Sequence, residues 1–230
     1  MSGLIRFDVL TIFPEMILSV LSESIIGRAI RNGILEINAI NIRDFSKDKH
    51  LKTDDYPYGG GAGMVMTPQP IYDAWLSIVE DLCYNPRFIY LSPQGSRLTQ
   101  KMALKLKEVK HMILLCGHYE GVDERIIELL ADEEISIGDY VLTGGEIPAM
   151  ALIDCVSRLI PGVLPSDEAF SNESHFDGLL EFPQYTRPPD FMGKTVPEVL
   201  LSGHHANIEN WRHEMSLKRT AEKRPDLLIP

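Results

Sequence analysis

The sequence has 230 residues, 44% of them hydrophobic and 24% charged, and its formal net charge is −11. This composition excludes a globally disordered chain and suffices for one large domain with a small appendage, while the acidic balance argues against wrapping nucleic acid over the whole surface. No apolar run approaches the roughly 20 residues that span a bilayer, and the N-terminus lacks a signal-peptide pattern, so we expect a cytoplasmic protein without membrane association.

Short apolar runs alternate with helical patterns along most of the chain, which predicts an α/β fold with a parallel sheet covered on both faces. The first expected elements are a strand at 5–13, one helix from Pro14 to Gly33 and a strand at 34–42. Residues 43–67 are polar and then glycine-rich, which predicts a long loop. The later elements are expected in this order: a helix at 68–82, a strand at 87–91, a helix capped by Thr99, a strand at 111–116, a helix at 122–130, a strand at 135–142 and a helix at 148–160.

The composition changes after residue 164, where Ser, Asp, Glu, Asn and Pro dominate. We therefore predict a flexible linker at 165–175 between a domain at 1–164 and a small domain at 176–230. In the small domain, 185–189 must be extended and 204–223 is predicted to be helical. About fifty residues cannot form a large core alone, so we expect this domain to dock on another molecule.

The three cysteines, Cys83, Cys116 and Cys155, are widely spaced and odd in number. They match neither a zinc pattern nor a disulfide framework. We expect them to be small buried hydrophobic residues in a reducing compartment.

Three consecutive strands of the predicted sheet end in glycine-containing loops, at 91–95, 116–121 and 138–146. Ligands of open α/β sheets bind beyond the carboxyl ends of the strands, and glycine lets a backbone approach a ligand closely. Each loop alone is equally well explained as a tight turn, but three loops on adjacent strands favour a pocket. No GxGxxG motif follows the first strand, and the glycine-rich segment 59–64 lacks the Gly-Lys-Ser/Thr of a phosphate loop, which disfavours hydride transfer and ATP hydrolysis.

Eight motifs follow one another between residues 58 and 204. They are Tyr58-Gly-Gly-Gly-Ala-Gly-Met64, Leu91-Ser-Pro-Gln-Gly95, Gly117-His-Tyr-Glu-Gly-Val-Asp-Glu-Arg125, Glu134-Ile-Ser-Ile-Gly-Asp-Tyr-Val-Leu-Thr-Gly-Gly-Glu146, Arg158-Leu-Ile-Pro-Gly-Val163, Gly178-Leu-Leu-Glu181, Tyr185-Thr-Arg-Pro188 and Val199-Leu-Leu-Ser-Gly-His204. Together they resemble the bacterial tRNA (guanine-N1-)-methyltransferase (TrmD) family of the SPOUT superfamily. A set of long motifs in one order is far more specific than any one of them.

The resemblance implies a SPOUT fold, an α/β domain whose C-terminal part is a deep trefoil knot that binds S-adenosylmethionine in a bent shape. It also implies an obligate homodimer with shared active sites. The substrate it implies is the tRNA guanine immediately 3′ of the anticodon, position 37, whose conversion to 1-methylguanosine maintains the reading frame. The family is linked to magnesium during methyl transfer, but no residues of this sequence mark a metal site. By motif match the donor-binding residues are Tyr90, Leu91, Ser92, Pro93, Gln94, Gly95, Gly117, Tyr119, Glu120, Gly121, Ile137, Gly138, Asp139, Tyr140, Val141, Leu142, Gly144, Gly145 and Pro148.

Methylation of guanine N1 requires a base that removes the N1 proton and a cation that stabilises negative charge on O6. The resemblance assigns the cation to Arg158, which is otherwise an exposed charge on the closing helix. The family's base is an Asp before a Ser; here Glu173 precedes Ser174, and Asp177 is a second candidate. Both acids are otherwise solvated linker residues. Glu120 is a candidate for binding the guanine edge, and the alternative is a carboxylate that braces the knot.

The remaining substrate contacts are expected from two regions. The resemblance to the family places Gly59, Gly60 and Gly61 beside the target base. The alternative is that this segment is only a flexible connector. The segment from residue 211 to 224 carries a net charge of +3, which fits a tRNA-backbone contact or a solvated helix surface. The basic residues assigned to tRNA are Arg187, Arg212, Lys218 and Arg219. Two rival functions are a SPOUT methyltransferase acting on ribose 2′-OH or ribosomal RNA, and a catalytically silent RNA-binding module.

Overall fold

The computed structural model describes residues 4–166, 170 and 173–228. The chain forms two compact units, residues 1–167 and 168–230. Among the described residues, no helix is long and apolar enough to cross a membrane.

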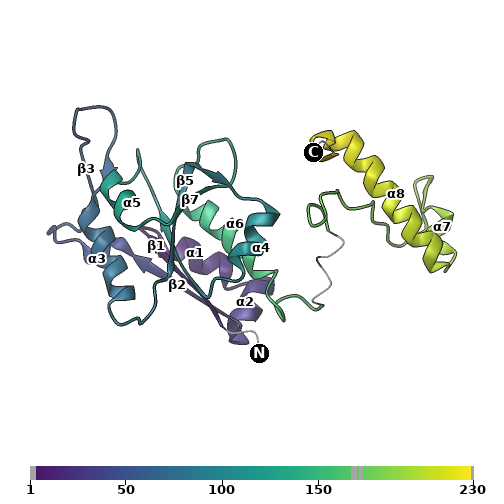
Figure 1. Cartoon of the computed structure of the whole chain (residues 1–230), viewed down its shortest axis with the longest axis horizontal. Coiled ribbons are helices and arrows are strands. Elements are labelled where there is room, and N and C mark those ends of the chain that lie inside the picture. The colour runs from purple at the N-terminus through teal and green to yellow at the C-terminus, as the bar shows by residue number, and fades with distance from the viewer. Residues whose placement is uncertain (1–3, 167–169, 171–172, 229–230) are drawn as a thin grey trace. The chain divides into compact units, whose positions relative to one another are not determined.

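The larger unit is built on a five-stranded parallel sheet with the strand order β2-β1-β6-β5-β7 (Figure 1). The strands are β1 (Ile5–Thr11), β2 (Leu35–Asn41), β5 (Arg87–Arg97), β6 (His111–Cys116) and β7 (Glu133–Ser136). β6 lies between β1 and β5 and is buried along its whole length, as its unbroken apolar run predicts. The α/β fold with a parallel sheet is therefore confirmed. Because the strands are parallel, the carboxyl ends of β5, β6 and β7 meet at one edge.

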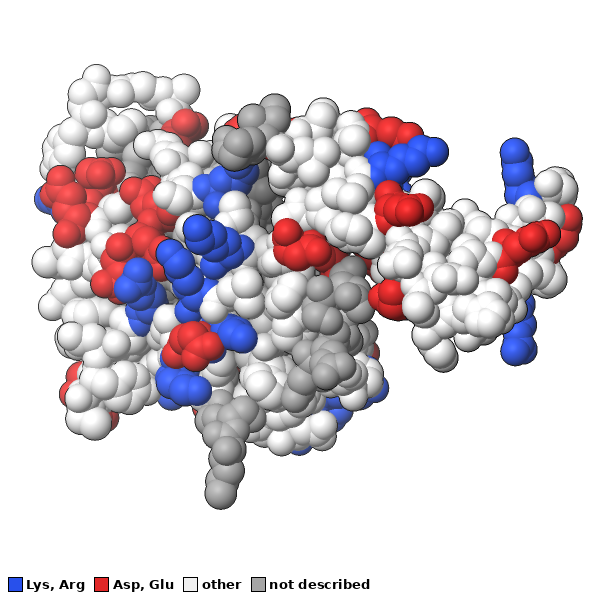
Figure 2. Space-filling view, turned by 45° about the vertical axis from the view of Figure 1, so that its right-hand side comes forward, with Lys and Arg blue, Asp and Glu red and all other residues white. Residues whose placement is uncertain are grey.

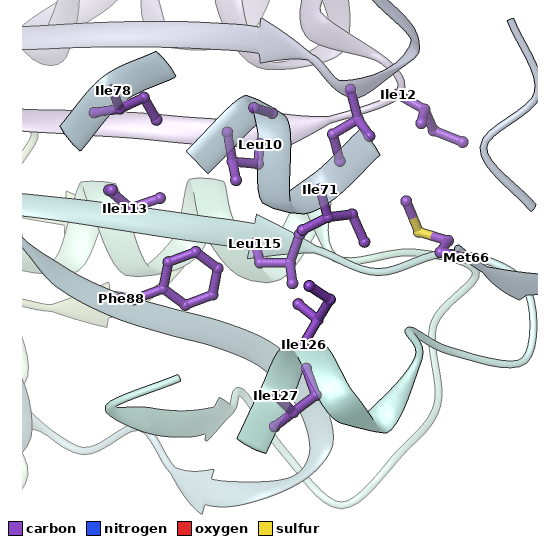
Figure 3. Packing of buried hydrophobic residues seen from close by; sticks show 12 residues of the cluster. Leu10, Ile12, Met66, Ile71, Ile78, Phe88, Ile113, Leu115, Ile126 and Ile127 are labelled. Atoms are coloured by element: carbon purple, nitrogen blue, oxygen red, sulfur yellow. The ribbon is translucent and has the colours of Figure 1, made fainter. Parts of the chain in front are cut away.

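Helices cover both faces of this sheet (Figure 1). On one face lie α3 (Pro68–Val79) and α5 (Glu124–Leu130), and on the other α1 (Pro14–Leu21), α2 (Ser24–Arg31), α4 (Gln100–Leu106) and α6 (Glu146–Ser157). Beneath α3 and α5, Ile71 and Ile126 pack on Leu10, Ile113 and Phe88 of the sheet (Figure 3). Each such buried side chain contributes about 1.5–3 kcal/mol to folding. The predicted cap of α4 is also confirmed, since Thr99 Oγ1 accepts a hydrogen bond of 3.3 Å from the backbone N–H of Met102.

The single helix expected from Pro14 to Gly33 is wrong. The chain breaks after α1 and begins α2 at Ser24, whose φ of 55° is not helical. A Cβ on Gly27 would collide with the carbonyl oxygen of Ser22, so this glycine permits the close fold-back between the two helices. One continuous helix would place Val20 and Ser24 on the same face as the buried Ile17 and Leu21, but both are exposed.

Other boundaries also differ from the expectation. β5 continues to Arg97, and β7 ends at Ser136 instead of residue 142, because residues 137–142 leave the sheet. The long loop expected at 43–67 carries a 3-10 turn, η1 (Ile42–Phe45), and two short antiparallel strands, β3 (Asp54–Asp55) and β4 (Val65–Met66). All three cysteines are free thiols. Cys116 is buried as expected, Cys155 is half-buried, and Cys83 is exposed, which corrects that expectation.

The smaller unit contains the helix expected at 204–223, which is α8 (His205–Lys223). Around it are α7 (Glu198–Leu201), η2 (Pro225–Leu228) and a hairpin of β8 (Asp190–Phe191) and β9 (Lys194–Thr195). The buried side chains of α8 are polar: Thr220 Oγ1 donates to the carbonyl of Ser216 (2.7 Å) and accepts from the N–H of Leu180 (2.9 Å). A hydrogen bond therefore ties the segment around Leu180 to α8.

A buried acid lies on β1, between β2 and β6. Asp8 of β1 is fully buried and accepts hydrogen bonds from His111 Nε2 (2.6 Å), Asn38 Nδ2 (2.8 Å) and Arg6 Nε (2.9 Å). Burial alone would raise the pKa of Asp8, but these three hydrogen bonds outweigh it and hold the pKa below its ordinary value. The ionised form of Asp8 is therefore the one that stabilises the fold.

We expect the Asp8→Asn variant to be less stable than the wild type by about 1–3 kcal/mol at neutral pH. Because the pKa of Asp8 is lower in the folded state, its contribution is complete above the unfolded-state pKa of about 4 and is lost as the pH falls through the folded-state value. Urea unfolding at pH 7 and at several pH values below about 4 measures both effects. The half-exposed Glu36→Gln variant on the neighbouring strand serves as the control, and equal stability of the two variants would contradict the assignment.

Candidate functional site

A cavity of about 220 Å³ opens at the edge where β5, β6 and β7 end. Its wall is formed by the three loops that follow these strands, together with the first residues of α6. All the residues expected from the motifs to bind a methyl donor line it except Gly95 and Asp139. Four lining residues were missed, namely His118, Ile135, Ser136 and Thr143. The pocket predicted from the three glycine-containing loops is therefore present.

The first loop is a local interruption of the pairing between β5 and β7. Leu91 and Ser96 both oppose Ile135, so residues 92–95 leave the sheet and then rejoin it. Ser92 Oγ accepts a hydrogen bond of 3.2 Å from the N–H of Gln94 and closes the turn. A Cβ on Gly95 would lie 2.5 Å from the backbone nitrogen of Ile135, so this glycine allows the loop to pass over β7. Its role is local, which explains its place outside the cavity wall.

The third loop is held by a serine at the end of β7. Ser136 Oγ donates to the carbonyl of Gly138 (2.9 Å) and accepts from its N–H (3.2 Å), which turns the chain sharply. Tyr140 and Val141 follow and are largely exposed although they line the cavity. The carboxylate of Asp139 lies 3.6 Å from Arg97 on the surface of the loop. Asp139 therefore shapes the loop from outside the cavity.

The second loop and the start of α6 approach at backbone distance. The N–H of Gly145 donates to the carbonyl of Gly117 (2.9 Å), and His118 and Gly144 form an antiparallel bridge. A Cβ on Gly145 would lie 2.6 Å from Cα of Cys116, at the buried end of β6. Glycine is therefore required at 145 if the two segments are to enclose the cavity together.

A polar network behind this contact was not predicted. Glu146, the first residue of α6, is 2% exposed and accepts a hydrogen bond of 2.6 Å from Thr11 Oγ1. Its second oxygen lies 2.9 Å from His118 Nε2. The N-terminus of a helix stabilises negative charge, which suits a buried carboxylate at this position. Burial, and next the Glu146 carboxylate, raise the pKa of the neighbouring Cys116 thiol well above its ordinary value, so Cys116 is not a nucleophile.

The glycine-rich segment at 59–64 is tied to the second loop through β4. The N–H of Met66 donates to the carbonyl of Gly121 (2.9 Å), and the N–H of Glu120 donates to the carbonyl of Met64 (3.0 Å). The three glycines at 59–61, expected beside the target base, have positive φ angles of 85°, 78° and 136° and do not line the cavity. The segment therefore leads into β4 next to Glu120, at the rim of the cavity.

The three other catalytic candidates belong to different units. Arg158 is the half-buried residue that caps the C-terminus of α6, and it is not part of the wall of the 220 Å³ cavity. Glu173 and Asp177 of the smaller unit line a cavity of about 130 Å³ with Arg212. Asp177 Oδ1 accepts a hydrogen bond of 3.1 Å from the N–H of Leu179, as in a local turn. The wall of the 220 Å³ cavity in the larger unit therefore contains none of these three side chains.

The basic residues assigned to tRNA divide into two groups. Arg212 lies 2.6 Å from Glu209 and over the ring of Phe182 at 4.9 Å, and Arg219 donates to the carbonyl of Glu181 at 3.3 Å. Lys218 and Arg187 are exposed. On the face in view in Figure 2, several Lys and Arg side chains lie side by side, with acidic side chains next to them.

Apolar side chains gather on the surface next to the cavity. Phe13, Met16, Val20 and Ile147 are each 40–55% exposed. Three of them, all but Val20, line a second cavity of about 310 Å³, which shares His118, Thr143 and Gly144 with the first. Exposed apolar areas of this kind commonly mark an interface.

Comparison with known proteins identifies the family. The family model described as tRNA (Guanine-1)-methyltransferase TrmD matches residues 5–229. Proteins named tRNA (guanine-N(1)-)-methyltransferase from Ruminiclostridium cellulolyticum, Lachnospira eligens and Clostridioides difficile are 68%, 58% and 58% identical to this chain. Each alignment covers 96% of this chain and 95%, 94% and 96% of the respective relative. The chain therefore belongs to the tRNA (guanine-1)-methyltransferase TrmD family.

Proposed function

We propose that this chain transfers a methyl group from S-adenosylmethionine to N1 of a tRNA guanine, the one at position 37 immediately 3′ of the anticodon, giving 1-methylguanosine. The observation that carries the proposal is the cavity at the carboxyl edge of the sheet, whose wall consists almost entirely of residues that the family motifs assign to the methyl donor. We also propose that the reaction takes place in the cytoplasm, because its substrate is a tRNA.

The lining of the cavity suits such a donor chemically. When bound, S-adenosylmethionine supplies a methyl group attached to a positively charged sulfur. The backbone of three loops offers N–H and C=O groups to the edge of its adenine, and Tyr90 and Leu91 offer apolar surface. The space beside Gly121 is open, because a Cβ there would meet no heavy atom closer than 3.9 Å. Burial, and next the nearby Glu134, raise the pKa of Tyr90, which keeps its hydroxyl neutral.

The side chains of the protein have two tasks in this reaction. One carboxylate accepts the N1 proton of guanine, and Glu173 and Asp177, which share the cavity of the smaller unit, are the two candidates. The guanidinium of Arg158 stabilises the negative charge that then develops on O6. Glu120 on the cavity rim accepts hydrogen bonds from the guanine edge once the base has left its stack.

We also propose a homodimer with shared active sites. The exposed side chains of Phe13, Met16 and Ile147 support it, because they line a cavity that shares three wall residues with the donor cavity. A second copy on this surface would bury them and bring further side chains to the rim. That arrangement would supply the residues that the wall of the larger unit lacks.

A trefoil knot within 1–164 and tRNA binding by 176–230 complete the proposal. The path of the chain supports the knot: after β7 at the sheet edge, Gly145 returns to Gly117 and α6 packs against β6 and β1. Exposed Lys218 and Arg187 support contact with the tRNA backbone. In the part of the chain that is described, no three His, Cys, Asp or Glu side chains are grouped as metal ligands, so we assign magnesium no residues.

Incubation with labelled S-adenosylmethionine and unmodified tRNA tests the proposal. We expect one label per tRNA, located at N1 of guanine 37. When that guanine is replaced by adenine, which offers no N1–H, labelling should fall at least about 100-fold. Equal labelling of both tRNAs, as a ribose 2′-OH methyltransferase would give, sinks the proposal. A protein that binds donor and tRNA but transfers no label would also contradict the proposal, because a catalytically silent RNA-binding module would behave in this way.

A further inference from the structure

Gly63 lies directly against the side chain of Glu120. A Cβ built on Gly63 would lie 2.5 Å from Cγ and 2.8 Å from Cδ of Glu120, and closer still to Oε1. The side chain of Glu120 therefore occupies the volume that any other residue at 63 would need. Gly59 and Gly60, with similarly positive φ angles, have no heavy atom within 4 Å of a Cβ position. The contact is thus particular to Gly63 and is not a general property of the glycine-rich segment.

The backbone on both sides of this contact is fixed. The N–H of Glu120 donates to the carbonyl of Met64, and Met66 forms a parallel bridge with Val122. The N–H of His118 lies 3.2 Å from Met66 Sδ, and Met66 itself is fully buried. A side chain at 63 therefore cannot be accommodated by separating the two segments at small cost, whereas the exposed, flexible Glu120 side chain can move. A side chain at position 63 would therefore displace the Glu120 carboxylate.

We infer that Gly63 is a positioning residue for methyl transfer, because its missing side chain leaves the space that the Glu120 side chain occupies at the rim of the donor cavity. The inference rests on the proposed function, in which Glu120 binds the guanine edge. Glu120 lines the cavity, and the glycine-rich segment enters β4 beside it. Gly63 therefore acts on the base through Glu120, without touching donor or guanine.

A double-mutant cycle of Gly63→Ala and Glu120→Ala tests this coupling. We expect Gly63→Ala to slow single-turnover methylation of tRNA about 10- to 100-fold, the order expected for a misplaced group, with the affinity for S-adenosylhomocysteine changed less than about threefold. In the Glu120→Ala background all three contacting atoms are absent, so Gly63→Ala should slow the reaction no further. If Glu120→Ala has no measurable turnover, the same cycle is measured on tRNA affinity with S-adenosylhomocysteine bound.

Gly33→Ala is the matched control for backbone strain. Gly33 has a φ of 69° and no heavy atom within 4 Å of a Cβ position, so its substitution adds similar strain without the collision. We expect a similar loss of thermal stability in both variants and a slower reaction only for Gly63→Ala. The inference is overturned if the two variants react equally fast, or if the effects of Gly63→Ala and Glu120→Ala multiply. A wild-type protein that does not label guanine 37 would instead contradict the proposed function itself.

Discussion

Replacement of Arg158 by alanine is expected to reduce methyl transfer about 100- to 1000-fold while S-adenosylhomocysteine still binds with nearly normal affinity. Removal of the N1 proton pushes negative charge onto O6 of guanine, and loss of one preorganised positive group at such a centre costs this order of magnitude. Arg158 follows α6 and lies outside the wall of the donor cavity, so its loss leaves the donor loops in place. Single-turnover rates and calorimetric donor binding measure the two effects separately.

Two further variants sharpen this result. Arg158→Lys keeps the charge but not the planar fork of hydrogen-bond donors, so a rate between those of wild type and Arg158→Ala would indicate directed hydrogen bonding to the base. Arg28→Ala removes an exposed arginine from the last turn of α2 and should react normally. A normal rate for Arg158→Ala, or a parallel loss of donor affinity, would show that Arg158 has a different role.

The donor pocket could be predicted because its cause is local. A glycine-containing loop at the carboxyl end of a strand is visible in the sequence, and the parallel order of β5, β6 and β7 brings three such loops to one edge. Gly95 shows the limit of this reasoning. Its motif places it with the cavity residues, but the reason for the glycine is its approach to Ile135. The local sequence pattern therefore identifies the loop, but it does not show which glycine lines the cavity and which one permits close packing.

The network behind the pocket could not be predicted because its members are distant in sequence. Thr11 and Glu146 are separated by 135 positions, and His118 and Glu146 by 28. Each belongs to a different element, and only the packing of α6 beneath β1 and β6 brings them together. The break between α1 and α2 has a similar cause, since the close approach of Gly27 to Ser22 is a feature of the folded chain.

Substitution of Gly145 by alanine should weaken donor binding at least about 100-fold and destabilise the larger unit by about 1–3 kcal/mol, the usual cost of overpacking a core. The added methyl group would lie 2.6 Å from Cα of Cys116 and 3.1 Å from the backbone nitrogen of Gly117, and neither atom belongs to a flexible side chain. The φ of Gly145 is −82°, so alanine adds no backbone strain and the effect is steric. The start of α6 must move away from the donor loop.

This displacement affects both walls of the cavity at once. It lengthens the hydrogen bond from Gly145 to Gly117 and separates Glu146 from His118, which opens the second loop on the side where the donor is proposed to bind. Calorimetric titration with S-adenosylhomocysteine and a thermal melt measure the two effects. Gly33→Ala, which adds a methyl group in open space, is the control for donor affinity. If Gly145→Ala reduces stability but leaves donor affinity normal, the donor does not bind in this cavity. A donor held between the second loop and the start of α6 would bind more weakly once these segments separate.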